Sequence, residues 1–300
     1  MSIPLNLMPD GPDLTQDTYY PMYEVAAELR SILIPKFGSG ETQAIIRLIF
    51  HYLKGWSATD MIINENRPIS AHIIYRIREI VGRLLKDEPI QYIVGNAYFY
   101  GMDFEVAPGV LVPRPETEEL VELVVKQNKH PDLHILDACT GSGCIAVAIA
   151  RNVPFSQVEG VDISDKALEV AQRNSDKLKT KVKFIHQDIF TYQPQAESLD
   201  VIVSNPPYID ESEMKDMEAN VLDYEPHEAL FVDDADPLKF YRRIAEIGKT
   251  ALKQGGRLYF EINPRHAAEM ESLLKEMGYD NIEIQLDIHG KKRFATATKN

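Results

Sequence analysis

The sequence has few of the residues that build metal centres and disulfide frameworks. Only two cysteines occur in 300 residues, Cys139 and Cys144, and the eight histidines are scattered along the chain. A Cys-x4-Cys spacing without a neighbouring histidine is a poor metal site, and a disulfide would deform the loop that the two thiols flank. No histidine stands at a spacing from Ser, Cys or Glu that suggests hydrolysis. We therefore expect no metal and interpret both cysteines as packing residues.

The chain also lacks a long apolar run. The longest stretches, such as residues 44–50, are interrupted by charge and are too short to cross a bilayer. No basic segment followed by an apolar stretch opens the sequence, which argues against secretion. With 44% hydrophobic and 26% charged residues, the composition is that of a globular protein. We expect no membrane partner and a cytoplasmic location.

Basic residues are outnumbered by acidic ones, and the imbalance is uneven. The formal net charge is −14; residues 1–95 hold 9 Lys and Arg against 11 Asp and Glu, and residues 96–300 hold 23 against 35. Residues 210–236 contain eleven acids and one base, Lys215. A nucleic-acid groove needs the opposite sign, so no direct nucleic-acid partner is expected. A cationic protein loop would suit this segment, and the alternative is a solvated acidic loop kept for solubility.

The first third of the chain predicts a small helical bundle. After a loose arm of about fifteen residues, helical patterns span residues 20–37, 41–54, 58–63 and 71–86, with Ser39, Ser57 and Ser70 available as N-caps. The last helix has one apolar face, which is either core or a surface that grips a protein substrate. We expect residues 1–95 to form an N-terminal substrate-recognition domain, and residues 96–112 to form a β-hairpin linker.

Strands and helices alternate from residue 113 to residue 300. Strands are expected in the apolar stretch from His134 and at residues 158–161, 182–185, 199–204, 257–262, 282–287 and 293–298. Helices are expected after the first glycine loop and at residues 117–126, 167–174, 237–252 and 267–277. This alternation predicts an α/β fold with a doubly wound sheet that ends in an antiparallel hairpin.

The most informative segment is residues 201–208, an apolar strand that runs into Asn205, Pro206, Pro207 and Tyr208. The two prolines end the strand, because each lacks an N–H and has a fixed φ. Ligands of an open α/β sheet bind outside the carboxyl ends of its strands, which places Asn205 beside a substrate. Its side-chain oxygen and the Pro206 carbonyl can accept the hydrogens of a planar –NH2 group. Read alone, the tetrapeptide is equally well a turn.

Three earlier strand ends predict a nucleoside site. The first is followed by a loop whose glycines allow close approach of a ligand, made of Cys139, Thr140, Gly141, Ser142 and Gly143. Asp162 can accept ribose hydroxyls, and Asp188 can accept an adenine N–H. Ile163 and Ile189 can sandwich the ring. The loop has no Lys or Arg and lacks the first glycine of a dinucleotide fingerprint, which favours S-adenosyl-L-methionine over NAD or ATP.

These motifs resemble those of the bacterial release factor glutamine methyltransferases, the protein-(glutamine-N5) methyltransferase family. The matching segments are residues 89–95, 112–118, 137–143, 161–164, 204–209 and 224–226. The resemblance implies a class I S-adenosylmethionine-dependent methyltransferase sheet, with S-adenosyl-L-homocysteine as product. It also implies methylation of the side-chain amide of the glutamine in the Gly-Gly-Gln loop of peptide chain release factors, the proteins of translation termination.

The chain departs from the family pattern at two places. Cys139 replaces a glycine of the cofactor loop, where it can alter the contact with the methionine end of the cofactor, although a non-glycine residue is compatible there with the ordinary φ that we expect. Asn263, Pro264 and Arg265 replace a glycine-containing segment, and no consequence is predicted. Arg114 and Glu116 lie at a helix start, where they either form an ion pair or contact cofactor or substrate.

Our mechanistic hypothesis is that Asn205 and the Pro206 carbonyl hold the substrate nitrogen in line with the transferable methyl group, with Asn205 also bordering the cofactor. Pro207 would stiffen the loop, and Tyr208 would pack on the substrate. The main alternative is a nucleic-acid methyltransferase acting on the exocyclic amine of adenine or guanine. A catalytically silent cofactor-binding protein and an NAD-dependent oxidoreductase are further alternatives.

Overall fold

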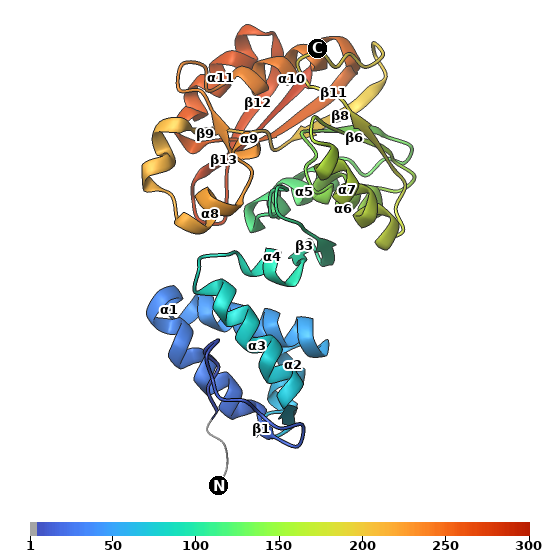
Figure 1. Ribbon diagram of the computed structural model, residues 1–300. Helices are drawn as coiled ribbons and strands as arrows, with labels where there is room; N and C mark the ends of the chain where they lie inside the picture. Colours follow the sequence, from blue (N-terminus) through green and yellow to red (C-terminus); the bar gives the residue numbers. More distant parts are fainter. Residues whose placement is uncertain (1–4) are drawn as a thin grey trace. The chain divides into compact units, whose positions relative to one another are not determined.

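The chain divides into two compact units that meet in sequence between Gly95 and Asn96 (Figure 1). The structure, a computed structural model, describes residues 5–300 without the side chain of residue 219. The elements of the first unit are β1 (Tyr19–Pro21), α1 (Met22–Lys54), α2 (Ala58–Ile63), β2 (Pro68–Ser70), α3 (Ala71–Leu84) and α4 (Ile90–Val94). The predicted helical character of this region is confirmed.

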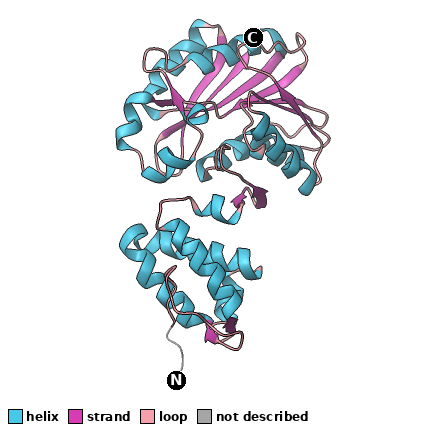
Figure 2. Ribbon diagram, in the orientation of Figure 1, coloured by secondary structure: helices cyan, strands magenta, loops and turns pink. Residues whose placement is uncertain are grey.

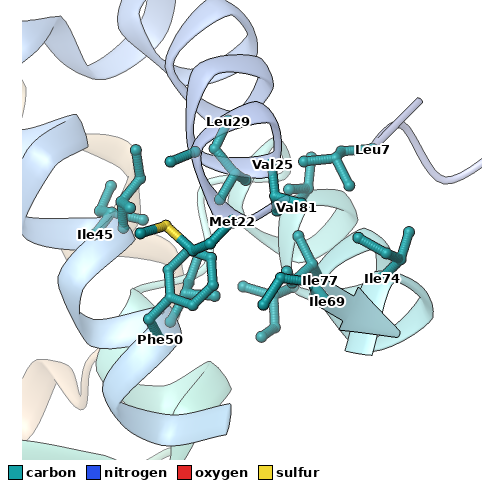
Figure 3. Packing of buried hydrophobic residues seen from close by; sticks show 14 of the residues in the cluster. Leu7, Met22, Val25, Leu29, Ile45, Phe50, Ile69, Ile74, Ile77 and Val81 are labelled. Carbon is teal, nitrogen blue, oxygen red and sulfur yellow. The ribbon is translucent and has the colours of Figure 1, made fainter. Parts of the chain in front are cut away.

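The first unit has its own core of packed apolar side chains. Leu29 and Phe50 from α1 meet Ile77 and Val81 from α3, and all four are fully buried (Figure 3). Helix α1 is broken at Gly38, whose φ of 71° and ψ of 171° are not helical. The break explains why the sequence predicts two helices in this span.

Only one of the predicted serine caps forms. The Ser57 side chain accepts a hydrogen bond from the Asp60 backbone N–H and completes a capping box at the start of α2. Ser39 lies within α1, and Ser70 precedes α3 without a side-chain cap hydrogen bond.

The arm before β1 is anchored, so the prediction of a loose arm is wrong for its described part. The buried Arg78 donates to the carbonyls of Asn6 at 2.6 Å and Pro12 at 2.8 Å. The Leu14 backbone N–H donates to the Tyr75 hydroxyl at 2.8 Å. Residues 1–4 lie outside the described part of the chain. The arm stays in place because α3 supplies donors and acceptors for its backbone.

The second unit is an α/β domain (Figure 2). Its strands are β3 (Asn96–Phe99), β4 (Met102–Glu105), β5 (His134–Ala138), β6 (Gln157–Asp162), β7 (Val182–His186), β8 (Leu199–Ser204), β9 (Ile209–Asp210), β10 (Phe231–Val232), β11 (Leu252–Glu261), β12 (Tyr279–Leu286) and β13 (Lys292–Lys299). Its helices are α5 (Pro115–Gln127), α6 (Cys144–Asn152), α7 (Asp165–Lys177), η1 (Glu211–Asp216), α8 (Ala219–Tyr224), α9 (His227–Leu230), α10 (Lys239–Ala251), η2 (Pro264–His266) and α11 (Ala267–Glu276).

The central sheet has seven strands in the order β12-β13-β11-β8-β5-β6-β7. The pairs from β11 to β7 are parallel, whereas β13 pairs antiparallel with both β11 and β12. The chain moves from β5 through β6 to β7 in one direction and then returns to β8, on the opposite side of β5. This reversal opens a crevice at the carboxyl ends of β5 and β8. The predicted doubly wound sheet with an antiparallel final hairpin is confirmed.

Helices cover both faces of this sheet (Figure 1), because its strand residues alternate between two cores. Leu136, Ile202 and Phe260 pack with residues of α10 and α11. Their neighbours Ile135 and Val201 pack with residues of α5 and α6. Successive residues of a strand point to opposite faces, so apolar strands without a polar alternation indicate burial on both sides.

The hairpin of β3 and β4 packs as part of the second unit. Phe99, Met102 and Phe104 share a buried cluster with Leu120 and Val124 of α5. The hairpin therefore contributes core residues to the second unit, which begins at Asn96, in addition to the linking role predicted for it. Within residues 5–300, no helix is long and apolar enough to span a membrane.

Candidate active site

The loop between β5 and α6 holds three residues in the left-handed region of backbone space. Cys139 has a φ of 61°, Gly141 of 55° and Gly143 of 77°. A Cβ on Gly143 would lie 2.9 Å from the Cβ of Ala171, so glycine is also required there by space. The expectation of an ordinary φ at Cys139 is wrong, and the left-handed conformation costs a non-glycine residue about 1–2 kcal/mol.

Asp137, near the end of β5, stabilises this loop through hydrogen bonds. Its Oδ2 accepts hydrogen bonds from the Thr140 hydroxyl at 2.6 Å and from the Ala146 N–H at 3.1 Å. Its Oδ1 is buried and has no partner among the described residues. Burial raises the pKa of Asp137 to about 7, against the lowering effect of these two hydrogen bonds. Thr140 and Ser142 are buried, so their side chains pack within the loop and present little surface to a ligand.

A cavity of about 300 Å³ lies at the carboxyl ends of the central strands. It is lined by Cys139 and Gly141 from the first loop, Asp162, Ile163 and Ser164 after β6, Gln187, Asp188, Ile189 and Phe190 after β7, and Asn205 and Pro207 after β8. The structure thus brings together the four strand ends on which the sequence prediction rests.

Asp162 is held by backbone donors on two sides. Its carboxylate accepts the Gly141 N–H at 2.8 Å and the Ser164 N–H at 3.0 Å. Burial raises the pKa of Asp162, and these backbone hydrogen bonds oppose the increase by stabilising the carboxylate. The acid therefore sits in a fixed orientation at the cavity wall, as recognition of two ribose hydroxyls requires.

The far end of the cavity combines one acid with apolar side chains. The Asp188 Oδ1 accepts the Phe190 N–H at 2.9 Å. Ile163 and Phe190 are exposed, and the Phe190 ring lies 5.1 Å from that of Phe240, measured between centroids. Ile189 lines the cavity while most of its side chain is buried in the sheet core. This end suits a planar heterocycle.

Sequence reasoning missed several lining residues. They are Gly109, Val110 and Leu111 before α5, Pro226, Glu228 and Ala229 at α9, and Phe240 on α10. These positions carry no strand-end signal, because they belong to loops and short helices that approach the cavity only in the folded chain. Residue 226 lies in one of the family-like segments, which is the only hint that the sequence offers.

The charged side chains among these lining residues are all acidic: Asp162, Asp188 and Glu228. Such a lining disfavours phosphate groups and favours a ligand with positive charge. A nucleoside that carries a sulfonium group and an ammonium group has this charge. S-adenosylmethionine therefore fits the residues present better than a dinucleotide does.

The Asn205 side chain is fixed at one end and open at the other. Its Nδ2 donates to the Thr117 hydroxyl at 3.2 Å. Within residues 5–300, no group donates a hydrogen bond to the Asn205 Oδ1 or to the Pro206 carbonyl. Asn205 and Pro207 line the cavity, whereas the Pro206 side chain is buried. The arrangement leaves two oxygen acceptors available at the end of β8.

Tyr208 makes contacts that hold the loop after β8. Its hydroxyl donates to the Glu261 Oε1 at 3.0 Å, and its carbonyl accepts from the Asn263 Nδ2 at 3.1 Å. The Asn263 Nδ2 also donates to the Glu213 Oε1 at 2.7 Å. Asn263 thus fastens the loop, which gives a physical role to one of the unexplained departures. The predicted packing of Tyr208 on the substrate stays a prediction.

Arg114 forms an ion pair, although not with Glu116. Its Nη2 lies 2.5 Å from the Oε1 of the buried Glu225, whose other oxygen accepts the Val112 N–H at 3.3 Å. The pair ties the segment before α5 to the turn after α8. Arg114 also lines a small cavity next to Asn205, so a substrate contact is compatible with this position. The role of Glu116 stays a prediction.

Comparisons with known proteins agree with this geometry. Residues 116–230 match the methyltransferase small domain family, and residues 30–95 match the PrmC N-terminal domain family. A release factor glutamine methyltransferase of Bacteroides thetaiotaomicron is 46% identical over 280 residues, which cover 93% of this chain and 100% of that protein. One of Flavobacterium psychrophilum is 41% identical over 253 residues, which cover 83% of this chain and 88% of that protein.

A solved structure supports the fold alone. The 16S rRNA N2 G1207 methyltransferase RsmC of Thermus thermophilus, in complex with AdoMet and guanosine, has a TM-score of 0.50 and 19% identity. The match covers 68% of this chain and 50% of that chain. The predicted methyltransferase fold is confirmed, and the identity and coverage of the relatives show that the chain belongs to the family of the release factor glutamine methyltransferases.

Proposed function

We propose that this protein transfers a methyl group from S-adenosyl-L-methionine to the side-chain amide nitrogen of the glutamine in the Gly-Gly-Gln motif of peptide chain release factors. The observation that carries this proposal is the amide of Asn205, whose nitrogen is bound to Thr117 while its oxygen is open. An open pair of oxygen acceptors beside a nucleoside cavity suits a neutral primary amide as the methyl acceptor. The family relatives carry the name of this activity.

Residues at three strand ends would hold the cofactor. Asp162 would accept hydrogen bonds from the ribose, and Asp188 would accept one from the adenine amino group. Ile163 and Phe190 would cover the ring, and Gly141 would allow the methionine portion to approach the backbone. When bound, S-adenosylmethionine supplies an electrophilic methyl group on a sulfonium.

Asn205 and Pro206 would orient the substrate amide. An amide nitrogen is a weak nucleophile, because its lone pair is delocalised into the carbonyl group. Acceptance of one N–H by the Asn205 Oδ1 and of the other by the Pro206 carbonyl restricts the nitrogen to one position. Both oxygens also stabilise the positive charge that develops on nitrogen as the methyl group is transferred.

Proton loss needs no dedicated base in this scheme. The methylated nitrogen of a protonated amide is strongly acidic, so its extra proton passes to either acceptor oxygen and then to water. Asn205 and Pro206 thus have two tasks, positioning before transfer and proton acceptance after it.

The charge of the second unit suits a cationic protein substrate. Exposed acids of residues 210–236 include Glu211 and Asp216 of η1, directly after the loop that holds Asn205. A release factor that docks on ribosomal RNA needs basic surface around its catalytic loop. We assign substrate recognition also to the helical unit of residues 1–95 and place the reaction in the cytoplasm, where release factors act.

Labelled S-adenosylmethionine tests the proposal directly. The protein is incubated with purified release factor, and the labelled residue is mapped by mass spectrometry. We expect one methyl group on the glutamine of the Gly-Gly-Gln motif and none on a release factor in which that glutamine is alanine. Label on RNA or DNA at low salt, with none on the release factor, would instead identify an exocyclic-amine methyltransferase.

A further inference from the structure

Three segments that are distant in sequence join in one chain of hydrogen bonds behind the proposed substrate site. The Asn205 Nδ2 donates to the Thr117 Oγ1 at 3.2 Å, and the Thr117 hydroxyl donates to the Glu261 Oε2 at 2.7 Å. Thr117 lies in the first turn of α5, and Glu261 ends β11. Their exposed fractions are 2% and 1%, so water does not compete for these contacts.

The hydrogen bonds in this series can run in one direction only. The second oxygen of Glu261 accepts from the Tyr208 hydroxyl at 3.0 Å, so the carboxylate accepts from two hydroxyls. A hydroxyl has one hydrogen, and that of Thr117 is used by Glu261. The Thr117 oxygen can then only accept, and the nitrogen of the Asn205 amide is the end that can donate to it. The Asn205 oxygen must occupy the opposite, open end.

Both oxygens of Glu261 accept a hydroxyl hydrogen, which is the arrangement that this direction needs. Burial raises the pKa of Glu261, and the hydrogen bonds from Thr117 and Tyr208 and the positive charge of Arg293 offset part of this increase. The negative charge of Glu116 raises it further, so these neighbours act against one another. Two hydroxyl donors are the usual compensation for a buried carboxylate.

We propose that Glu261 and Thr117 are positioning residues that orient the Asn205 amide, so that its oxygen faces the substrate and its nitrogen cannot. The inference rests on the proposed function, because it explains how the site selects an amide over an acid. With the orientation fixed, the Asn205 oxygen accepts one N–H of the glutamine amide, and the Pro206 carbonyl accepts the other. A reversed Asn205 would offer donors, which suit the carboxylate of glutamate instead.

The test replaces Thr117 by valine, which has nearly the same shape but no hydroxyl. Asn205 then loses its partner and populates both orientations. We expect the turnover number of Thr117→Val to fall about tenfold, the factor equivalent to about 1.4 kcal/mol. The dissociation constant of S-adenosylmethionine should change less than about threefold. Thr117→Ser keeps the hydroxyl and should restore most of the turnover.

Substrate preference separates orientation from general damage. The affinity of each variant is measured for release factor with glutamine and with glutamate in its Gly-Gly-Gln motif. The wild type should prefer glutamine strongly, and Thr117→Val and Glu261→Gln should each reduce this preference about tenfold. A merely structural role of the two residues would weaken both affinities equally. Glu261→Gln is the second test variant. Its amide can donate a hydrogen bond to the Thr117 hydroxyl and so reverse the direction of the hydrogen bonds that reach Asn205.

Thr296→Val is the matched control for substitution of a buried threonine. Thr296 is 7% exposed and lies on β13, outside the cavities that Asn205 lines, so neither turnover nor preference should change. An unchanged glutamine preference in both Thr117→Val and Glu261→Gln would overturn the inference. Wild-type protein that methylates no release factor would refute the proposed function itself, which is a separate result.

Discussion

Asn205 and Asp137 lie at the carboxyl ends of neighbouring strands. Each side chain has one polar atom with a hydrogen-bond partner and one without such a partner among the described residues. The Asn205 Oδ1 accepts no hydrogen bond within residues 5–300, and the buried Asp137 Oδ1 has no partner there either. The Asn205 side chain borders the cavity, so its oxygen is accessible to a ligand. The Asp137 oxygen is buried, and buried polar atoms without a partner are rare in folded proteins because they cost stability.

Replacement of Asn205 by alanine should separate catalysis from cofactor binding. Removal of a preorganised acceptor costs about 100-fold or more in turnover, whereas the contacts proposed for the cofactor with Asp162 and Asp188 are unchanged. Single-turnover kinetics and calorimetric titration with S-adenosylmethionine measure the two effects. Asp162→Ala is the reciprocal variant and should weaken cofactor binding more than it slows methyl transfer. Equal losses of turnover and cofactor affinity in Asn205→Ala would assign this residue to the cofactor.

Asp137 should make the protein less stable as the pH rises through the acidic range. Its pKa is about 7 in the folded state and about 3.9 in an unfolded chain. Between these values the folded state binds more protons, so the free energy of unfolding falls with rising pH by up to about 1.4 kcal/mol per unit. Above pH 7 this contribution becomes constant.

The isosteric variant Asp137→Asn lacks this titration and keeps an oxygen for Thr140 and Ala146. From pH 5 to pH 8, wild-type protein should therefore lose about 2–3 kcal/mol more stability than the variant. Urea unfolding at a series of pH values, without cofactor, measures the difference. If the stabilities of wild type and variant change in parallel with pH, the Asp137 carboxyl has the same pKa in the folded and unfolded states, and the prediction is wrong.

At the scale of elements, the cofactor loop depends on glycine for two different reasons. Gly143 at the start of α6 faces Ala171 of α7, which leaves no room for a Cβ. A Cβ on Gly141 meets no heavy atom within 4 Å, because this residue borders the open cavity. The same substitution should therefore have different consequences at the two positions.

Gly143→Ala should lower the free energy of unfolding by about 2–4 kcal/mol, from the left-handed backbone plus the steric clash. Gly141→Ala should cost about 1–2 kcal/mol, from the backbone alone, and should weaken binding of S-adenosylmethionine by intruding on the cavity. Denaturant unfolding and cofactor titration of both variants are compared. The prediction fails if the more destabilised variant is Gly141→Ala.

The ion pair between Arg114 and Glu225 joins the start of α5 to the end of α8. Arg114→Met leaves the buried Glu225 carboxylate without its cation, which should cost about 2 kcal/mol. This is below the usual range for buried pairs, because the Arg114 side chain is 34% exposed. Adding Glu225→Gln removes the unpaired charge and should recover part of the loss, as unfolding of both variants would show.

Activity of the same double variant distinguishes the two interpretations of Arg114. If the ion pair is its whole role, kcat/KM recovers together with stability. A double variant that regains stability and stays slow would place the Arg114 side chain on substrate or cofactor.

For the whole molecule, the acidic charge should act on the release factor and spare the cofactor. Eleven of the 46 acids lie within residues 210–236. Attraction between exposed charges weakens as salt shortens the Debye length from about 10 Å at 0.1 M towards 3 Å at 1 M. The KM for the release factor should therefore rise several-fold over this range of salt, while cofactor affinity changes little.

Charge reversal locates this effect. Glu211→Lys with Asp216→Lys, both exposed on η1, should raise the KM for the release factor about tenfold at low salt. Glu271→Lys with Glu276→Lys makes the same change in net charge on the exposed surface of α11 and serves as control. Equal effects of the two pairs would indicate a response to net charge and not to the acidic segment.

Most elements of the second unit could be predicted from the sequence, because apolar strands and their breaks are local patterns. Asp162, Asp188 and Asn205 lie at or just after the ends of such strands, and parallel strands bring their carboxyl ends to one edge. The same pattern gave no sign of α9 or of the lining residues on it. Short helices and loops have too little periodicity for prediction from one sequence.

Local sequence patterns are enough to predict which residues gather at the strand ends and that the chain around them is acidic. Other features depend on contacts made only in the folded chain: the left-handed φ of Cys139, the arm anchored by Arg78, and the hydrogen bond from Thr117 to Glu261 across 144 positions. The physical reason is that the spacing of apolar residues along the chain is a local pattern. The direction of a buried hydrogen bond depends instead on partners that only folding brings within reach.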